Sequence, residues 1–308
     1  MTSTRLTVSL PGTALRDALG APPTGVELLS WDLAGPAPRS SIDIVVPPYM
    51  GATKTLGQLA GVTTRLVQSQ SIGFDGVENS LPPGHVFANA AGVHETSTAE
   101  LTLALILASQ RGLPDFIRAA GEGRWAPARH ESLADRTVLL IGYGGVGQAI
   151  EARLLPFETE VVRVARSART DERGQIHGID ELPDLLPQAD VVVVGVPLGP
   201  ETTRLVDDTF LSRMRDGALL VNIARGKVAD TDALLRHAAS GRLRLALDVT
   251  DPEPLPTSHP LFALPNVLIS PHVGGASTAM MPRLRRLLRS QIERMLRGEE
   301  PLNVVLRS

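Results

Sequence analysis

The stretch VLLIGYGGVGQAI, residues 138–150, has the pattern of a strand, a glycine-rich turn and the start of a helix. Gly142, Gly144 and Gly147 fit the spacing G-x-G-x-x-G. The first glycine permits a tight turn, the second lets the backbone approach a pyrophosphate, and the third lets helix and strand pack closely. Such a motif alone is a weak signal in a chain with 28 glycines, but here the flanking strand and helix are both present. The stretch therefore predicts a dinucleotide-binding domain.

Short apolar runs alternate with helical patterns on both sides of this motif, which predicts an α/β chain with mostly parallel sheets. Helices are expected over 96–110, starting at Thr96-Ser97-Thr98 with Glu100 behind it, and over 279–298. Strands of the first domain are expected at 5–10, 26–31, 42–46, 65–70 and 85–90, with a last extended piece at 301–305 that could rejoin it. Strands of the nucleotide domain are expected at 138–142, 160–165, 191–196, 218–223, 245–249 and 267–271.

The composition is that of a soluble globular protein, and 308 residues correspond to about two domains. The absence of cysteine excludes disulfides, thiolate nucleophiles and cysteine-ligated zinc, and it fits a cytoplasmic location. No metal-ligand set is assigned. A formal charge of −3 gives no sign of a nucleic-acid partner. The longest apolar stretch, 101–108, is far shorter than the ~20 residues of a membrane span, so no membrane partner is expected.

The end of the second strand of the nucleotide domain indicates which cofactor is bound. An NAD enzyme usually carries an acidic residue there, which binds the ribose 2′-hydroxyl. This chain has Ala165, Arg166 and Ser167 instead, and a guanidinium with a hydroxyl would bind the 2′-phosphate that distinguishes NADP. Arg166 could also be an ordinary surface arginine. We expect NADP(H) to be preferred over NAD(H).

Three residues after predicted strands of the nucleotide domain could complete a redox site: Arg225, Glu253 and His272. Ligands gather outside the carboxyl ends of such strands. A guanidinium can hold the carboxylate of a 2-oxo acid, an imidazole can supply a proton to its carbonyl oxygen, and a carboxylate can fix the imidazole. Each has a structural alternative: Arg225 as a turn cap, Glu253 as a loop residue, and His272 as a satisfied strand-end histidine.

The chain resembles the D-isomer-specific 2-hydroxyacid dehydrogenases, nearest to the NADPH-preferring glyoxylate/hydroxypyruvate reductase branch. The resemblance is carried by the glycine motif and by these segments in order: SIGFDGV (71–77), NAAGVHETSTAELTLALIL (89–107), VPLGPETTRLVDDTFLSRMRDGALLVNIARG (196–226), ALDVTDPEPL (246–255), NVLISPHVGG (266–275) and the terminal PLNVV. The segments IARG, DVTDPEP and SPHVGG are specific to this family.

The resemblance implies a Rossmann-type, doubly wound nucleotide domain (96–279) inserted into a flavodoxin-like substrate domain (1–95 and 280–308), with the active site in the interdomain cleft and a homodimer. It implies that Arg225 binds substrate, Glu253 partners the histidine and His272 is the general acid/base. It also implies that the loop of Ser71, Ile72 and Gly73 binds the substrate carboxylate, and that Asp248 contacts the nicotinamide carboxamide. The residues expected at the cofactor are Gly142, Tyr143, Gly144, Gly145, Val146, Gly147, Ala165, Arg166, Ser167, Val196, Pro197, Ile223, Ala224, Asp248 and Gly274.

Small departures from the family pattern are Ala91 in place of a proline and Gly199 in place of a threonine. Trp125, in GRWAP, is expected in the substrate pocket, in the core or at a dimer contact. The leading hypothesis is reduction of a small 2-oxo acid such as glyoxylate or hydroxypyruvate to the D-hydroxy acid. The alternatives are another substrate (phosphite, a sugar acid, a phosphoglycerate-like or a bulky 2-oxo acid) and a non-catalytic, nucleotide-sensing protein similar to co-repressors of this fold.

Overall fold

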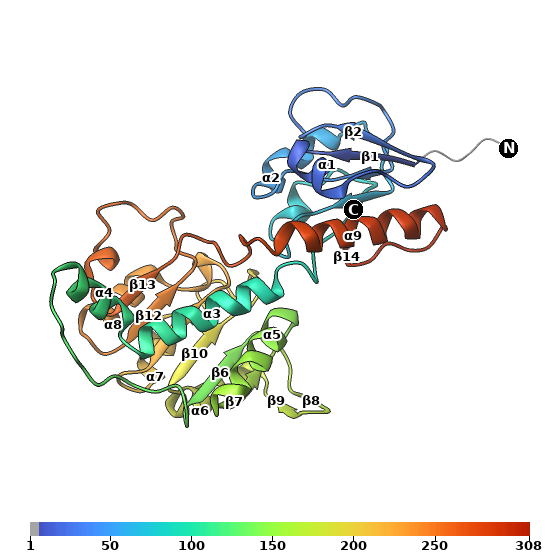
Figure 1. The fold of residues 1–308 in the computed structure, drawn as a ribbon. Coiled ribbons are helices and arrows are strands. Elements are labelled where there is room, and N and C mark those ends of the chain that lie inside the picture. Colours follow the sequence, from blue (N-terminus) through green and yellow to red (C-terminus); the bar gives the residue numbers. More distant parts are fainter. Residues whose placement is uncertain (1–5) are drawn as a thin grey trace. The chain divides into compact units, whose positions relative to one another are not determined.

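The computed structural model describes residues 6–308 and divides the chain into two compact units (Figure 1). Unit 1 comprises Met1–His94 and Ser277–Ser308, and unit 2 comprises Glu95–Ala276. Both are built from a sheet with helices on its faces, so the predicted α/β class is confirmed. Within the described part of the chain, no helix is both long and apolar enough to cross a membrane.

Unit 1 holds a six-stranded sheet in the order β14-β5-β4-β3-β1-β2. The strands are parallel except β14, which runs antiparallel to β5, so the C-terminal segment does rejoin the first domain. Without β14, this is the flavodoxin-like order 2-1-3-4-5. The elements are β1 (Leu6–Leu10), α1 (Thr13–Leu19), β2 (Val26–Ser30), β3 (Ile44–Val45), α2 (Ala52–Thr55), β4 (Leu66–Gln68), β5 (Val86–Ala88), α9 (Met280–Leu296) and β14 (Val304–Arg307).

Unit 2 holds a six-stranded, fully parallel sheet in the order β13-β12-β11-β10-β6-β7. The strands are β6 (Thr137–Ile141), β7 (Glu160–Val164), β10 (Val191–Val194), β11 (Leu219–Asn222), β12 (Arg244–Leu247) and β13 (Val267–Ile269). The chain runs outward from β6 to β7 and then crosses back to β10, on the other side of β6. At such a reversal the loops diverge and leave a crevice, which is where doubly wound sheets bind ligands.

Helices cover both faces of this second sheet, which explains why its central strands are apolar throughout. One apolar core lies between the sheet and α3 and α5, which pack side by side (Figure 1), and the other lies under α6, α7 and α8. The helices are α3 (Glu95–Gln110), α4 (Leu113–Gly121), α5 (Gly145–Leu154), α6 (Leu182–Leu185), α7 (Asp208–Arg213) and α8 (Thr231–Ala239). Helix α3 confirms the helix expected over 96–110. It begins one residue earlier, at Glu95, directly after a turn with Gly92 at φ 92°, so Thr96–Thr98 lie inside its first turn and do not cap it.

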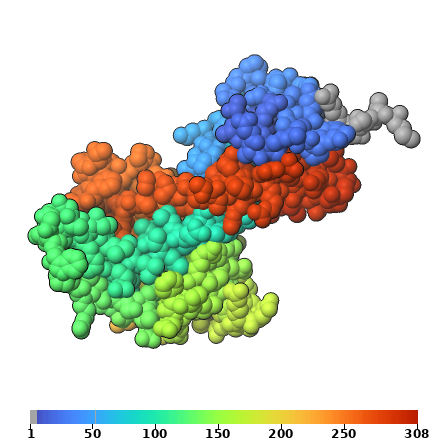
Figure 2. Space-filling view, in the orientation of Figure 1, coloured from blue at the N-terminus to red at the C-terminus, as the bar shows by residue number. Residues whose placement is uncertain are grey.

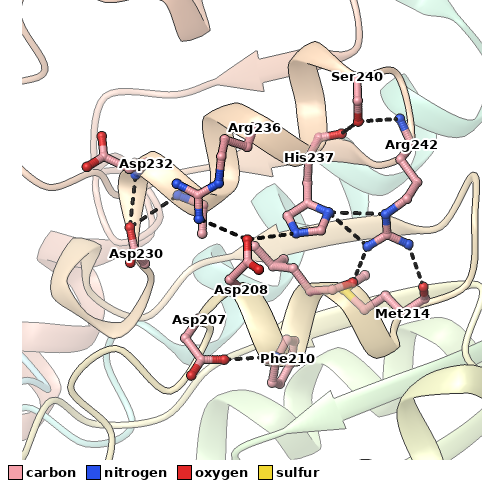
Figure 3. Close-up of polar contacts among 12 residues, drawn as sticks. Asp207, Asp208, Phe210, Met214, Asp230, Asp232, Arg236, His237, Ser240 and Arg242 are labelled. Carbon is pink, nitrogen blue, oxygen red and sulfur yellow. Dashed lines mark hydrogen bonds and ion pairs between the residues drawn. The ribbon is translucent and has the colours of Figure 1, made fainter.

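A polar cluster on α8 and the turn after it fastens α7 (Figure 3). The ring of His237 lies between Asp208, 3.3 Å from its Nε2, and Arg242, whose Nη2 lies 2.9 Å from its Nδ1. Arg242 also donates to the carbonyls of Leu211 and Met214, at the end of α7. Burial and the charge of Arg242 lower the pKa of His237. The cluster therefore requires a neutral imidazole, whose Nδ1 accepts from the guanidinium.

Candidate active site

The glycine motif lies at the carboxyl end of β6, beside the crossover that follows β10. Gly142 has a φ of 106°, and a Cβ there would lie 2.5 Å from the carbonyl oxygen of Gly195. A Cβ on Gly147 would lie 2.5 Å from the carbonyl oxygen of Gly142, so α5 can pack this closely only with glycine. Around Gly144, by contrast, a Cβ would meet nothing within 4 Å. The first and third glycines are thus demanded by the fold, while the second leaves open space at the N-terminus of α5, which fits a pyrophosphate.

Tyr143 is turned away from this loop surface. Its side chain is 4% exposed, and its hydroxyl donates to Glu151 over 2.5 Å. Burial, together with the bond to Glu151, raises the pKa of Tyr143. Of the residues expected at the cofactor, Tyr143 therefore contributes its side chain to the packing behind the motif and not to the surface of the loop.

After β7 the chain forms a small antiparallel hairpin, β8 (Arg169–Asp171) and β9 (Gly174–Ile176), which the sequence patterns did not reveal. The buried Arg163 holds it to β7, since its guanidinium donates to Asp171 over 3.0 Å and to the carbonyls of Arg173 and Gln175. Glu151 on α5 also binds Arg173, at 2.6 Å. The hairpin is therefore joined to the helix that carries the glycine motif.

This hairpin fixes the residues expected to select the cofactor. Ala165 donates its N–H to the carbonyl of His177, which follows β9. Arg166 and Ser167 are exposed, and neither side chain bonds to another residue within 6–308. Arg169, which the sequence analysis did not single out, donates to the carbonyl oxygen of Tyr143 over 3.3 Å and so lies beside the glycine loop. Arg166 thus stands at the position where an NAD enzyme usually carries an acidic residue, and Arg169 places a second guanidinium beside the glycine loop.

His272 and Glu253 are brought together, although 19 positions separate them in the chain. His272 Nδ1 lies 2.6 Å from Glu253 Oε1, with 27% and 40% of the two side chains exposed. This contact orients the ring, and His272 Nε2 has no hydrogen-bonding partner among residues 6–308. The imidazole is thus held by one nitrogen and presents the other, the arrangement that a general acid/base requires.

The loop that carries His272 is fastened by Asp248, which is 3% exposed at the end of β12. Its carboxylate accepts from Ser270 Oγ at 2.6 Å and from the N–H groups of Val273 and Gly274 at 2.9 Å each. Its carbonyl accepts from the N–H of His272, which has a left-handed φ of 52°. Sequence reasoning assigned Asp248 only to the cofactor and missed this anchoring contact, which depends on the pairing of β12 with β13.

Arg225 lies at the next strand of the same edge, after β11. The buried Asn222 shapes this turn, since its Oδ1 accepts from the N–H of Ala224 at 3.0 Å and its Nδ2 donates to the carbonyl of Arg225 at 3.2 Å. A Cβ on Gly226 would lie 1.8 Å from the carbonyl oxygen of Thr250. The Arg225 turn therefore packs directly on the segment that leads from Asp248 to Glu253. Three adjacent strands thus deliver the guanidinium, the carboxylate and the imidazole to one edge.

The remaining predicted residues are placed as follows. Val196 and Pro197 follow β10, Ile223 and Ala224 follow β11, and Gly145, Val146 and Gly274 lie in the loop or helix starts already described. In unit 1, Ser71, Ile72 and Gly73 form a half-buried loop after β4. The N–H of Ser71 donates to Ser69 Oγ, whereas those of Ile72 and Gly73 make no hydrogen bond within the described chain. Two backbone donors of this loop are therefore available.

A family model described as the NAD binding domain of D-isomer specific 2-hydroxyacid dehydrogenases matches residues 103–274. The chain belongs to this family. The dehydrogenase is 32% identical to human glyoxylate reductase/hydroxypyruvate reductase over 291 residues, which cover 89% of each chain. The family resemblance expected from the sequence motifs is confirmed.

Two solved structures are similar over nearly their whole length. One is a D-isomer specific 2-hydroxyacid dehydrogenase from Xanthobacter autotrophicus in complex with NADPH and MES, with a TM-score of 0.83, 28% identity, and coverage of 99% of this chain and 98% of that one. The other is an NADPH-dependent glyoxylate/hydroxypyruvate reductase from Sinorhizobium meliloti in complex with NADP and malonate, with a TM-score of 0.79, 25% identity, and coverage of 98% and 97%. The dehydrogenase is therefore an oxidoreductase that acts on CH–OH donors and uses a nicotinamide cofactor.

Proposed function

We propose that the dehydrogenase reduces a small 2-oxo acid, such as glyoxylate or hydroxypyruvate, to the D-hydroxy acid with NADPH. The observation that carries the proposal is the 2.6 Å contact between His272 and Glu253 on the strand edge that also bears Arg225. Human glyoxylate reductase/hydroxypyruvate reductase, among the relatives, supports this substrate class. Unit 2 is the nucleotide domain in this proposal, and unit 1 is the substrate domain.

The residues divide the work by their chemistry. The guanidinium of Arg225 binds the substrate carboxylate through paired N–H donors and polarises the neighbouring carbonyl. His272 donates the proton from Nε2 to the carbonyl oxygen, and Glu253 stabilises the charged imidazolium from which that proton leaves. The amides of Ile72 and Gly73 are further donors for the carboxylate. When bound, the nicotinamide cofactor supplies the hydride.

Preference for NADP(H) is the second part of the proposal. Arg166 and Ser167 are exposed and have no partner within residues 6–308, so their donors are free to bind a 2′-phosphate. Arg169 adds a second positive charge beside the glycine loop. The two solved relatives that contain NADPH or NADP support this assignment.

We further propose a homodimer formed through unit 2. Three large apolar side chains are exposed within a short span: Leu113 and Ile117 on α4, at 45% and 71%, and Trp125 after it, at 95%. Helix α4 and the segment after it lie on the surface of this unit, in green in Figure 2. Exposed apolar side chains of this size in close succession are typical of an interaction surface. Trp125 is outside the core, which leaves a dimer contact or a pocket as its role.

A panel of 2-oxo acids with NADPH and with NADH, followed by loss of the absorbance of the reduced nicotinamide, tests the proposal. We expect the highest kcat/KM with glyoxylate or hydroxypyruvate and NADPH. A preference for a bulky 2-oxo acid would refute the proposed substrate class, and a preference for NADH would refute the proposed cofactor. The dimer is tested by sedimentation or light scattering of the wild type and of a double variant that combines Ile117→Ser with Trp125→Ser. The double variant should dimerise more weakly.

A further inference from the structure

Unit 2 contains a cavity of about 560 Å³ at the edge of its sheet opposite to the candidate active site. Five of the six strands contribute to it at their amino ends: Arg136 before β6, Asp190 before β10, Ala218 before β11, Arg244 at the start of β12, and Asn266 before β13. The end of α3 and residues 129–131 close its other side. A volume of this size lies within the range of roughly 300–1,000 Å³ typical of small-molecule sites.

The charged side chains that line this cavity are equal in number but are not all paired with one another. Four arginines and four carboxylates line it: Arg129, Arg136, Arg215, Arg244, Asp115, Glu131, Asp190 and Asp216. Arg136 and Arg215 pair with Asp190, and Arg136 also pairs with Glu131. Asp115 and Asp216, however, pair with two arginines that do not line the cavity, Arg118 and Arg242. Arg129 and Arg244 are left without a carboxylate partner among the described residues.

Of these two arginines, Arg244 is the stronger indication of an anion site because its side chain is half-buried. Its Nε donates to the carbonyl of Gly217 over 3.0 Å, but its two terminal nitrogens make no hydrogen bond within residues 6–308. Burial lowers the pKa of this guanidinium. The charges of Glu131 and Asp190 oppose this shift, but both carboxylates form ion pairs with other arginines, so a bound anion would further stabilise the half-buried guanidinium.

We propose that this cavity binds a small organic anion, with a carboxylate or phosphate group on the guanidinium of Arg244. Arg129 at the rim is a second contact for the negative charge. The site is separate from the candidate active site, because it uses the opposite ends of the same strands. The proposal therefore does not depend on the identity of the substrate.

Titration calorimetry of the full chain tests the proposal, with citrate, 3-phosphoglycerate and inorganic phosphate as probes. The Arg225→Gln background removes the guanidinium that would bind such acids at the candidate active site. We expect citrate or 3-phosphoglycerate to bind with a Kd of about 1 mM or tighter, and inorganic phosphate, which is small, to bind more weakly. Citrate and 3-phosphoglycerate also distinguish carboxylate from phosphate as the preferred group.

Variants locate the binding. Arg244→Gln should weaken it by about tenfold or more, and Arg244→Lys should weaken it less. Arg213→Gln, an exposed arginine that does not line the cavity, is the matched control and should have no effect. Thermal unfolding checks that each variant is folded. Absence of binding by every probe, or binding that persists unchanged in Arg244→Gln, overturns the proposal.

Discussion

The contact between Glu253 and His272 allows the electrostatic part of the mechanism to be separated from the positioning part. In Glu253→Gln the amide oxygen can still accept from His272 Nδ1, so the ring keeps its orientation while the negative charge is lost. Two unit charges about 4 Å apart interact by about 4 kcal/mol at an effective dielectric constant of about 20, and by about 1 kcal/mol in water. Since 40% of the Glu253 side chain and 27% of the His272 side chain are exposed, a value between these limits, about 2 kcal/mol, is appropriate.

A loss of about 2 kcal/mol in transition-state stabilisation corresponds to a fall in kcat of about 30-fold. Steady-state kinetics with a saturating 2-oxo acid and NADPH measure it, and the KM for the cofactor should not change, because Glu253 lies outside the glycine loop. Glu253→Ala, which removes the hydrogen bond as well, should lose more activity than Glu253→Gln. A kcat for Glu253→Gln within about twofold of wild type would show that the carboxylate does not stabilise the imidazolium.

Three further changes test the rest of the account. Arg166→Glu should lower kcat/KM with NADPH by about 10–100-fold, which corresponds to the loss of one charge-assisted hydrogen bond, and should leave kcat/KM with NADH unchanged or higher. An equal loss of kcat/KM with both cofactors would contradict the role of this arginine. Gly226→Ala should lower the free energy of unfolding by about 1–3 kcal/mol and should lower activity, because the added Cβ would clash with Thr250. The control Gly121→Ala, whose Cβ would meet nothing within 4 Å, should change neither quantity. Thermal unfolding and kcat of both variants measure the difference. His237 has a lowered pKa, so the folded state binds its proton less readily than the unfolded chain does, and the free energy of unfolding should decrease as the pH falls below about 6.5. His237→Gln should remove that part of the pH dependence in denaturant titrations at about pH 7.5 and about pH 5, and an unchanged dependence would refute the link.

Local sequence patterns were sufficient for the class of fold and for most strands. The apolar runs at 191–196 and 218–223 contain the buried central strands β10 and β11 of a parallel sheet, and the glycines at 142–147 lie in a strand-to-helix turn. Both signals lie within one short segment, so they need no knowledge of distant residues. Most of the predicted strands were one to three residues longer than the observed ones, and Arg5, the first residue of the strand expected at 5–10, lies outside the described residues.

Features without a clear local signal, or that depend on distant contacts, were not predicted. The β8–β9 hairpin lacks such a signal, since it consists of two three-residue strands of mostly polar residues, and the buried Arg163 on β7 holds it in place. The anchoring of the histidine loop by Asp248 requires β12 to lie beside β13. For the candidate site, sequence reasoning named the three reacting residues one by one, while their shared strand edge follows from the sheet order. Their catalytic roles remain predictions.

The most direct test of the central claim is the variant His272→Gln, compared with wild type in NADPH-dependent reduction of glyoxylate and hydroxypyruvate. General acid catalysis contributes about 10²–10⁴-fold, so kcat should fall by at least about 10²-fold. The Kd for NADPH, measured by quenching of the protein fluorescence or by calorimetry, should stay within about twofold, because the cofactor is assigned to the glycine loop and to Arg166. A His272→Gln enzyme that keeps full activity, or one that loses activity only because NADPH no longer binds, would contradict the assignment of His272 as the general acid.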